Sequence, residues 1–528
     1  MKRGVCLGGW GLAASIGLAS CLICRVGGAQ PGGQTPASAA PGAESRAEEA
    51  DKSVVKIISV LRYPDAFQPW SKKAPVTSYA SGVVIEGKRI LTIAHAVACA
   101  SEVQVLANET GDKVTASVEG ISPEVDLAVL KLEEDTFFSN HPPLGRGLKL
   151  PGLKDPVTAY GYPAESSKVG SIKGSVLRID FAPYNGANAL RIQMDTPIPP
   201  GASGGPVVAE EKMIGLSFPP AGKPDGSSYA IPCEEIEMFL KGVHEGGYHG
   251  RPRLDVVLQE LKNPTLRAFL GVDKTVHGVV VQQVAADPAD SPLRKWDIIT
   301  QVGQTDVDDE GMIALGNGPQ VAFTYLLSQA EENGKVPMTV VRSGQRVHLA
   351  VPVPPSPPRL LPGLNGIYPD YFVYGPLCFS DASQDYLFEL MNSIVGGSGG
   401  LNGTLRLLDQ DTPLVARCDD LAKFEGERLV VVTTFFQHKI AESYASPVTQ
   451  VVKTINGVPI KNLAHMVEVL RDSKEKFIRI EFFGRYSRTL VFPREEMVAE
   501  TEAILTDNNV HSQGSAEMLA IWKGRKKE

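Results

Sequence analysis

The chain has 528 residues, of which 43% are hydrophobic and 21% are charged, and its formal net charge is −8. At about 150 residues per domain, this length predicts roughly three globular domains with real cores. The negative charge argues against nucleic acid as a partner, because a nucleic-acid-binding surface needs an excess of basic residues.

The N-terminus has the pattern of a targeting segment. Lys2 and Arg3 precede an apolar stretch from about Val5 to Ile23, as in a signal peptide. We therefore predict that residues 1–29 are a signal peptide or an N-terminal anchor and do not belong to the fold.

Three fates remain open for this segment. Cleavage after Ala29 predicts a soluble exported protein, lipidation at Cys21 predicts a lipid-anchored one, and the uncleaved stretch is nearly long enough to span a membrane. Each fate predicts an exported protein, periplasmic or associated with the cell envelope. Residues 30–52 are rich in Ala, Gly and Pro, which predicts a flexible tether.

Short β-type runs punctuated by Gly and Pro follow from about Val54 to Leu216 and predict a mainly β domain. One apolar run, Arg89–Val97, contains His95 among small residues, which leaves an imidazole room to reach a nucleophile and a substrate. A hydrogen-bonded structural histidine is the plainer alternative.

Asp126 stands in the next notable run, Val125–Leu132. Read with a period of two, Asp126 shares a strand face with Ala128 and Leu130. An ionised carboxylate on an apolar face is costly unless it is paired, so a histidine in need of an orienting partner explains Asp126 well. The alternative is a carboxylate at a strand end, still in water.

The sequence Pro200-Gly-Ala-Ser-Gly-Gly-Pro206 places Ser203 in a glycine-rich loop. The glycines allow a tight turn that exposes the hydroxyl and lets backbone amides converge where an oxyanion would form. An ordinary Gly/Pro turn has the same composition. The order His, Asp, Ser is that of chymotrypsin-type proteases and differs from the subtilisin and α/β-hydrolase orders.

With these segments in place, the chain resembles the HtrA/Deg serine proteases, closest to the plant-type Deg subgroup with a divergent second PDZ domain. The resemblance covers about Val54–Pro493 and implies a mainly β fold, with a chymotrypsin-like double β-barrel protease domain followed by two PDZ-like α+β domains. It is carried by Ser81–Ile85, Leu91–His95, Asp126–Lys131, Gly201–Pro206 and Tyr229–Pro232.

The resemblance implies a role for each site residue. His95 would be the general base, Asp126 its orienting partner and Ser203 the nucleophile, with the N–H groups of Gly201 and Ser203 forming the oxyanion hole. Ala202 departs from the family pattern, which usually has asparagine there, so the preorganisation of the oxyanion hole is in question.

The resemblance also places the walls of a specificity pocket at Ile198, Leu216 and Phe218. Since no acidic residue stands just before the nucleophile loop, we expect a small or medium apolar residue on the acyl side of the cleaved bond. The scattered cysteines Cys99, Cys233, Cys378 and Cys418 suggest neither zinc nor a disulfide framework. We expect no metal and no cofactor.

Residues 248–355 are predicted to form the first PDZ domain. Trp296–Val302 matches the PDZ core motif with Trp296 in place of the usual glycine, and Ala322–Leu327 would be the groove helix. A PDZ domain binds an extended peptide at a sheet edge and holds its terminal carboxylate with backbone amides. The predicted ligand loop is Arg253, Leu254, Asp255 and Val256.

Asp255 stands where the family favours glycine, and its charge should repel a peptide carboxylate. Internal peptide segments, or a role as an interdomain surface, are the two open alternatives. A weak repeat pairs Ile298–Val302 with Val451–Ile455, and it predicts the second PDZ domain. The Gly396–Gly400 run lacks a following Lys-Ser/Thr and is expected to be a loop.

The predicted domains beyond the tether are the protease domain at 53–247, the first PDZ domain at 248–355, a linker and extension at 356–410, the second PDZ-like domain at 411–500 and a tail at 501–528. We predict an exported serine endopeptidase for unfolded or damaged proteins, with PDZ peptide ligands and a trimer-based homo-oligomer. The alternative is a weakly active or inactive scaffold that binds clients through its PDZ domains.

Overall fold

A computed structural model of the chain describes residues 50–106, 113–184, 187–218, 227–248, 250–284, 291–315, 318–354, 359–395 and 411–524. The predicted targeting segment, Cys21 and the Gly396–Gly400 loop lie outside these residues. The chain divides into two compact units, the first made of Met1–Ser59, Thr77–Val97 and Glu102–Pro355, the second of Val60–Val76, Ala98–Ser101 and Ser356–Glu528.

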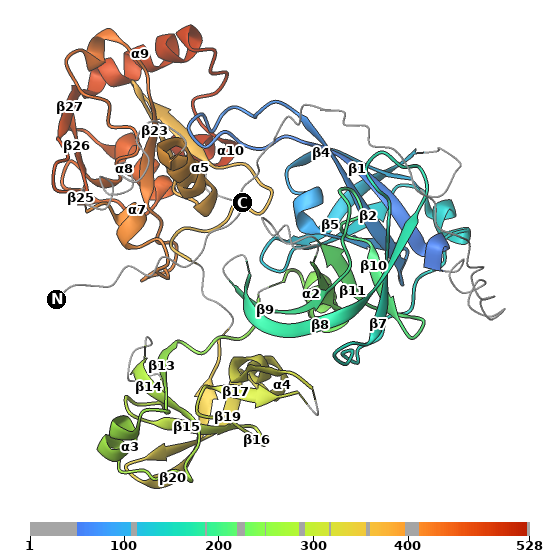
Figure 1. Cartoon of the computed structure of the whole chain (residues 1–528). Coiled ribbons are helices and arrows are strands. Elements are labelled where there is room, and N and C mark those ends of the chain that lie inside the picture. Colours follow the sequence, from blue (N-terminus) through green and yellow to red (C-terminus); the bar gives the residue numbers. More distant parts are fainter. Residues whose placement is uncertain are drawn as a thin grey trace, which may run out of the picture. The chain divides into compact units, whose positions relative to one another are not determined.

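The first β-barrel is closed in the order β1-β2-β3-β6-β5-β4. Strands β1, β2, β4 and β5 of this barrel are labelled in Figure 1. Its interior is tightly packed, because a Cβ added at Gly82 would lie 2.8 Å from the side chain of Ile90 on the next strand. Its strands are β1 (Val54–Leu61), β2 (Val76–Ile85), β3 (Arg89–Thr92), β4 (Ala100–Leu106), β5 (Lys113–Ser122) and β6 (Leu127–Leu132).

A second closed barrel has the order β10-β11-β12-β9-β8-β7. Helix α2 (Cys233–His244) follows its last strand, with Glu234 and Glu235 in the first turn and Lys241 in the last, as the helix dipole favours. The strands are β7 (Pro156–Gly161), β8 (Gly170–Tyr184), β9 (Ala187–Met194), β10 (Pro206–Ala209), β11 (Lys212–Phe218) and β12 (Ser228–Pro232). The two barrels confirm the predicted double-barrel fold.

The first PDZ-like domain has the sheet order β13-β14-β15-β19-β20, with β16 paired to β15, so β13 lies at a sheet edge. The predicted groove helix is instead a 3₁₀ turn, η3 (Phe323–Leu326), followed by the short helix α4 (Leu327–Ala330). The other elements are β13 (Val256–Glu260), α3 (Pro264–Leu270), β14 (Val279–Val284), β15 (Ile298–Val302), β16 (Thr305–Asp306), β17 (Met312–Ala314), β18 (Gln320–Ala322), β19 (Lys335–Arg342) and β20 (Gln345–Pro352).

This domain shares a hydrophobic core with the second barrel inside the first unit. The ring of Tyr325 lies 5.7 Å from that of Phe181 on β8, and its hydroxyl donates to Glu234 of α2 at 2.7 Å. Arg251 joins the same contact by donating to the fully buried Glu235 at 2.9 Å. A buried ion pair of this kind fixes how the two parts meet, since either charge alone would be costly to bury.

The second unit contains two sheets, β21-β22-β23 and β25-β24-β26-β27. Residues 513–515 run along the edge strand β21, because the N–H of Val373 donates to Gln513 O at 2.7 Å and that of Ser515 to Tyr371 O at 3.0 Å. The elements are β21 (Tyr371–Tyr374), β22 (Leu377–Asp381), α5 (Gln384–Val395), α7 (Pro413–Ala416), β23 (Val430–Phe435), η4 (Lys439–Ala441), β24 (Val452–Ile455), β25 (Val458–Pro459), α8 (Leu463–Asp472), β26 (Phe477–Phe482), β27 (Leu490–Pro493), α9 (Arg494–Asp507) and α10 (Ala516–Trp522).

The structure differs here from the expected boundaries. Two strands and a helix lie within 356–410, which we expected to hold a linker and extension, and α10 lies within the expected tail. The weak repeat that pairs Ile298–Val302 with Val451–Ile455 pointed only to the later half of this unit. Strands β21 and β22 lie well before Val451 and were not part of that repeat. Across the described ranges, the helices are too short or too polar to cross a lipid bilayer.

Candidate active site

His95 lies in a short 3₁₀ turn, η1 (Ala94–Ala96), directly after strand β3. Its neighbours Ala94 and Ala96 are buried, whereas the His95 side chain remains 57% exposed. The buried alanines anchor the turn, so the imidazole extends from a rigid base toward solvent.

Asp126 does not lie on a strand face as expected. It precedes β6 by one residue and has a positive φ of 59°, a conformation that Asp tolerates better than most residues. It is nevertheless only 2% exposed, so the alternative of a solvated strand end is wrong as well. The alternation of apolar residues along Val125–Leu132 did not reveal this turn, because such alternation does not mark the residue at which a strand begins.

The pairing of β3 with β6 brings His95 and Asp126 together. Thr92 lies opposite Ala128, so the turn after β3 meets the turn before β6. The Nδ1 of His95 lies 2.8 Å from Oδ2 and 3.0 Å from Oδ1 of Asp126, and the backbone N–H of His95 donates to Oδ1 at 3.0 Å. Asp126 therefore fixes both the backbone and the ring of His95.

Two opposing effects act on the pKa of His95. Desolvation, the largest single effect, lowers the pKa, but the hydrogen bond and the charge of Asp126 together raise it above its ordinary value. With Nδ1–H donated to the carboxylate, the neutral ring has its free lone pair at Nε2, which is the form that a general base needs.

Ser203 lies in the loop between β9 and β10 and is 7% exposed. The N–H of Ser81 donates to Ser203 O at 2.8 Å, and that of Gly204 donates to Ser217 O at 2.7 Å. Gly204 has a φ of 85°, and a Cβ there would lie 2.8 Å from Thr92 Oγ1. The loop thus lies against the end of β3, just before His95, although no Ser203–His95 hydrogen bond is found among the described residues.

Within the described chain, the N–H groups of Gly201 and Ser203, which we predicted for the oxyanion hole, donate to no other residue. Gly201 has a φ of 89°, and a Cβ there would lie 2.5 Å from Ala164 N. The loop must therefore have glycine at this position, because a side chain would meet both backbone strain and a clash.

Ser81 is a buried residue that sequence reasoning did not single out by role. Its Oγ donates to Gly201 O at 2.9 Å and accepts from Tyr162 N–H at 2.8 Å. Ser217 Oγ also donates to Ala202 O at 3.3 Å. These bonds hold the loop without an asparagine at Ala202. The available signal was a serine at the start of the apolar half of β2.

Ala202 is 6% exposed and faces the backbone of Gly161. A Cβ added at Gly161 would lie 2.8 Å from both Ala202 Cβ and Ala202 O. Ala202 and Gly161 are therefore close-packed as a pair, and the small side chain at 202 suits this contact.

The residues proposed for the specificity pocket, Ile198, Leu216 and Phe218, are apolar and are buried or partly buried. Leu216 is fully buried, and Phe218 is stacked on Tyr229 with ring centres 5.9 Å apart. The intervening Ser217 faces the nucleophile loop, so Leu216 and Phe218 lie on the other face of β11. Ile198 is partly buried against the core that includes the second barrel.

The proposed PDZ ligand loop leads into the edge strand β13. Arg253 and Asp255 are 3.5 Å apart, and the Arg253 N–H donates to Pro354 O at 3.2 Å. Leu254 and Val256 pack partly against the core. The charge of Asp255, expected to repel a carboxylate, is thus partly offset by Arg253.

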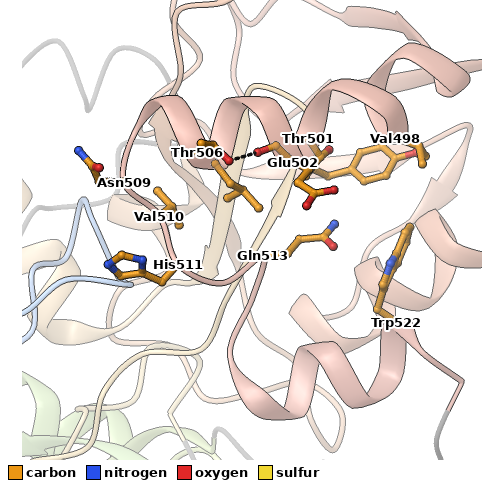
Figure 2. Close-up of a pocket in the computed structure, with 11 residues that line it drawn as sticks. Val498, Thr501, Glu502, Thr506, Asn509, Val510, His511, Gln513 and Trp522 are labelled. Atoms are coloured by element: carbon orange, nitrogen blue, oxygen red, sulfur yellow. Dashed lines mark hydrogen bonds between the residues drawn. The ribbon is translucent and has the colours of Figure 1, made fainter.

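A cavity of about 650 Å³ lies in the second unit, lined by α9, the segment after it and α10 (Figure 2). Its walls include Glu502, Gln513 and Trp522, and none of the residues proposed from the sequence lines it. The four cysteines of the described ranges are free thiols, and no cluster of His, Cys, Asp and Glu suited to a metal occurs there.

Comparison with known proteins places these features in context. A model of the trypsin-like peptidase domain matches residues 80–216, and a model of the PDZ domain matches residues 364–517. The chain is 30% identical over 474 residues to "Protease Do-like 2, chloroplastic" of Arabidopsis thaliana, covering 88% of this chain and 75% of that protein.

A second relative, "Protease Do-like 4, mitochondrial" of Arabidopsis thaliana, is 30% identical over 439 residues, which is 82% of this chain and 79% of that protein. Among solved structures, the "HtrA-type protease AlgW with decapeptide" is similar at 24% identity and a TM-score of 0.46, over 60% of this chain and 99% of that one.

Proposed function

From the premise that the chain belongs to the HtrA/Deg family of PDZ-containing serine endopeptidases, we propose that it cleaves unfolded or damaged proteins through a His95–Asp126–Ser203 triad. Family membership rests on the similarity to the Do-like proteases and on the trypsin-like and PDZ matches. The triad and the choice of substrate are proposals about this chain's own residues.

The observation that carries the triad is the double hold of Asp126 on His95. The carboxylate accepts from the backbone N–H and lies within 3.0 Å of Nδ1, so Nε2 is the ring nitrogen left to accept a proton. A carboxylate buried to 2% exposure stabilises the imidazolium that forms when this happens.

In the first step, His95 Nε2 takes the proton of Ser203 Oγ while Oγ forms a bond to the substrate carbonyl carbon. The carbonyl oxygen becomes an oxyanion that the N–H groups of Gly201 and Ser203 would stabilise. Collapse breaks the C–N bond, and His95 returns its proton to the leaving amine. A water molecule then attacks the acyl carbon while His95 Nε2 takes one of its protons. The ester bond to Ser203 Oγ breaks, His95 returns that proton to Oγ, and the carboxylic acid product leaves.

Protein substrates are supported by the PDZ-like modules. Among the described strands, β13 lies at the edge of its sheet, where an extended peptide could add, with Arg253 and Asp255 beside it. Because the charge there is mixed, we propose that internal segments of clients bind in preference to terminal carboxylates. A trimer or a multiple of it is the assembly that we propose from the family resemblance.

We propose that the protein works in a compartment other than the one in which it is synthesised, and that it reaches this compartment by export or by import into an organelle. The relatives compared above are named for chloroplast and mitochondrion, so a periplasmic site and a lipid anchor at Cys21 have no support from them. Residues 1–29 remain our candidate for the targeting signal.

The test uses a fluorophosphonate probe and casein with the mature protein, Ser203→Ala and, as a matched control, Ser117→Ala on the exposed face of β5. We expect the protein and Ser117→Ala to be labelled and to degrade casein, and Ser203→Ala to do neither. Casein degradation by Ser203→Ala would contradict the mechanism. An unlabelled, inactive protein that still binds unfolded clients would favour the scaffold alternative.

A further inference from the structure

The second unit includes two chain segments that come from the region around His95. Val60–Val76 connects β1 to β2, and Ala98–Ser101 follows His95 after only two residues. Both segments belong with residues 356–528 in one compact unit. The chain that carries His95 is therefore covalently joined to two segments that pack with residues 356–528 in the second unit. We call this second unit the C-terminal unit below.

Aromatic side chains fix the segment Val60–Val76 within this unit. The ring of Trp70 lies 5.5 Å from that of Phe436 and 6.2 Å from that of Tyr371, and the ring of Phe67 lies 5.5 Å from that of Tyr386. Aromatic contacts at these distances add to the burial of large apolar surfaces. Trp70 and Phe67 thus pack into two hydrophobic clusters of the C-terminal unit.

Polar contacts reinforce the same attachment. Glu389 accepts from the N–H of Ala66 at 3.2 Å and forms an ion pair with Lys73, while the hydroxyl of Thr434 donates to Phe67 O. These contacts span more than 300 residues of chain. The segment is therefore held along its length and not at a single point.

Two hydrogen bonds within the second unit link Tyr368 to Cys99 by way of Arg62. The hydroxyl of Tyr368 donates to Arg62 O at 2.8 Å, and the N–H of Arg62 donates to Cys99 O at 2.9 Å. The Nζ of Lys72 lies 4.1 Å from the centre of the Tyr368 ring and helps to orient it. Cys99 stands four residues after His95.

The backbone at Cys99 needs such support. Its φ is 59°, in the left-handed region that non-glycine residues rarely adopt and that persists only where surrounding contacts hold it. Gly366 lies close by, since a Cβ added there would lie 3.2 Å from Cys99 N. The conformation just after His95 is thus maintained by Arg62, and through it by Tyr368.

We propose that Tyr368 is a positioning residue for the catalytic histidine, acting through Arg62 and Cys99. The C-terminal unit then contributes to the rate of peptide-bond cleavage in addition to any part in substrate binding. The proposal rests on the proposed role of His95 as general base. It assigns the unit a task that does not require a bound peptide.

The test compares Tyr368→Phe with Tyr444→Phe in the full-length protein. Tyr444 is a matched control, because its hydroxyl also donates to a backbone carbonyl in the same unit, that of Val491 at 2.8 Å. Loss of one such bond at Tyr368 should lower kcat about three- to tenfold with KM unchanged, which is the effect of misplacing a group that acts in the transition state. Tyr444→Phe should leave both constants unchanged.

Rates are normalised to folded protein by circular dichroism, so that partial unfolding cannot mimic the effect. Equal kcat values for Tyr368→Phe and the unmodified protein would overturn the proposal. If Tyr368→Phe does not fold, Lys72→Met is measured in its place; a smaller fall in kcat supports the proposal and no change overturns it. If the unmodified protein itself fails to label with fluorophosphonate, it is the proposed function that fails.

Discussion

Asp126 lies one residue outside strand β6, and its Oδ2 is nevertheless 2.8 Å from the Nδ1 of His95. The pairing of Thr92 with Ala128 explains this, because it joins the ends of β3 and β6 where both turns begin. The positive φ of Asp126 then directs the carboxylate back under the imidazole. One strand register thus supplies the orientation that the proposed base requires.

Replacing Asp126 by asparagine should reduce kcat by about three to four orders of magnitude, because the amide stabilises neither the required tautomer nor the imidazolium. The change is nearly isosteric, so the fold should be retained. The rate of casein or peptide cleavage and the far-ultraviolet circular dichroism spectrum are the measurements. A loss below about tenfold would argue against Asp126 as the orienting residue.

The pH dependence should report the raised pKa of His95. Since the base must be neutral, kcat/KM should fall as the pH drops, with a midpoint above about 6.5, the ordinary value for histidine. In Asp126→Asn only desolvation remains, so the residual activity should show a lower midpoint. An acid limb below pH 6.5 in the unmodified protein would contradict the assignment.

Gly161→Ala should displace the nucleophile loop, because the new Cβ would lie 2.8 Å from Ala202 Cβ and from its carbonyl oxygen. Overpacking of this kind costs about 1–3 kcal/mol, and we expect a lower unfolding midpoint together with a lower kcat. Gly145→Ala is the control, since no heavy atom lies within 4 Å of its added Cβ. Similar effects of the two changes would show that the Gly161–Ala202 contact is unimportant.

Arg251→Met should destabilise the first unit by about 3–5 kcal/mol, because it leaves the Glu235 carboxylate buried without its charged partner. Thermal unfolding followed by tryptophan fluorescence measures this. The double variant Arg251→Met/Glu235→Gln should recover part of the loss. Arg253→Met is the control, as its ion pair with Asp255 is 3.5 Å long and Arg253 is 41% exposed.

The sequence was a good guide where local pattern decides structure. The β-type runs, the helix after Pro232 and the serine in its glycine-rich loop all follow from residues near one another in the chain. Trp296, noted as a replacement for glycine, has a φ of 74°, which is the conformation that a glycine would have adopted without strain.

The sequence by itself determined which residues the chain offers for catalysis, their order along the chain and the mainly β fold around them. Only the tertiary structure decided that Asp126 leaves its strand, that Ser81 holds Gly201, and that Trp70 packs in the C-terminal unit. These relationships depend on strand register and on contacts between residues far apart in the chain. Local periodicity carries no information about such partners, whereas packing a complete core does.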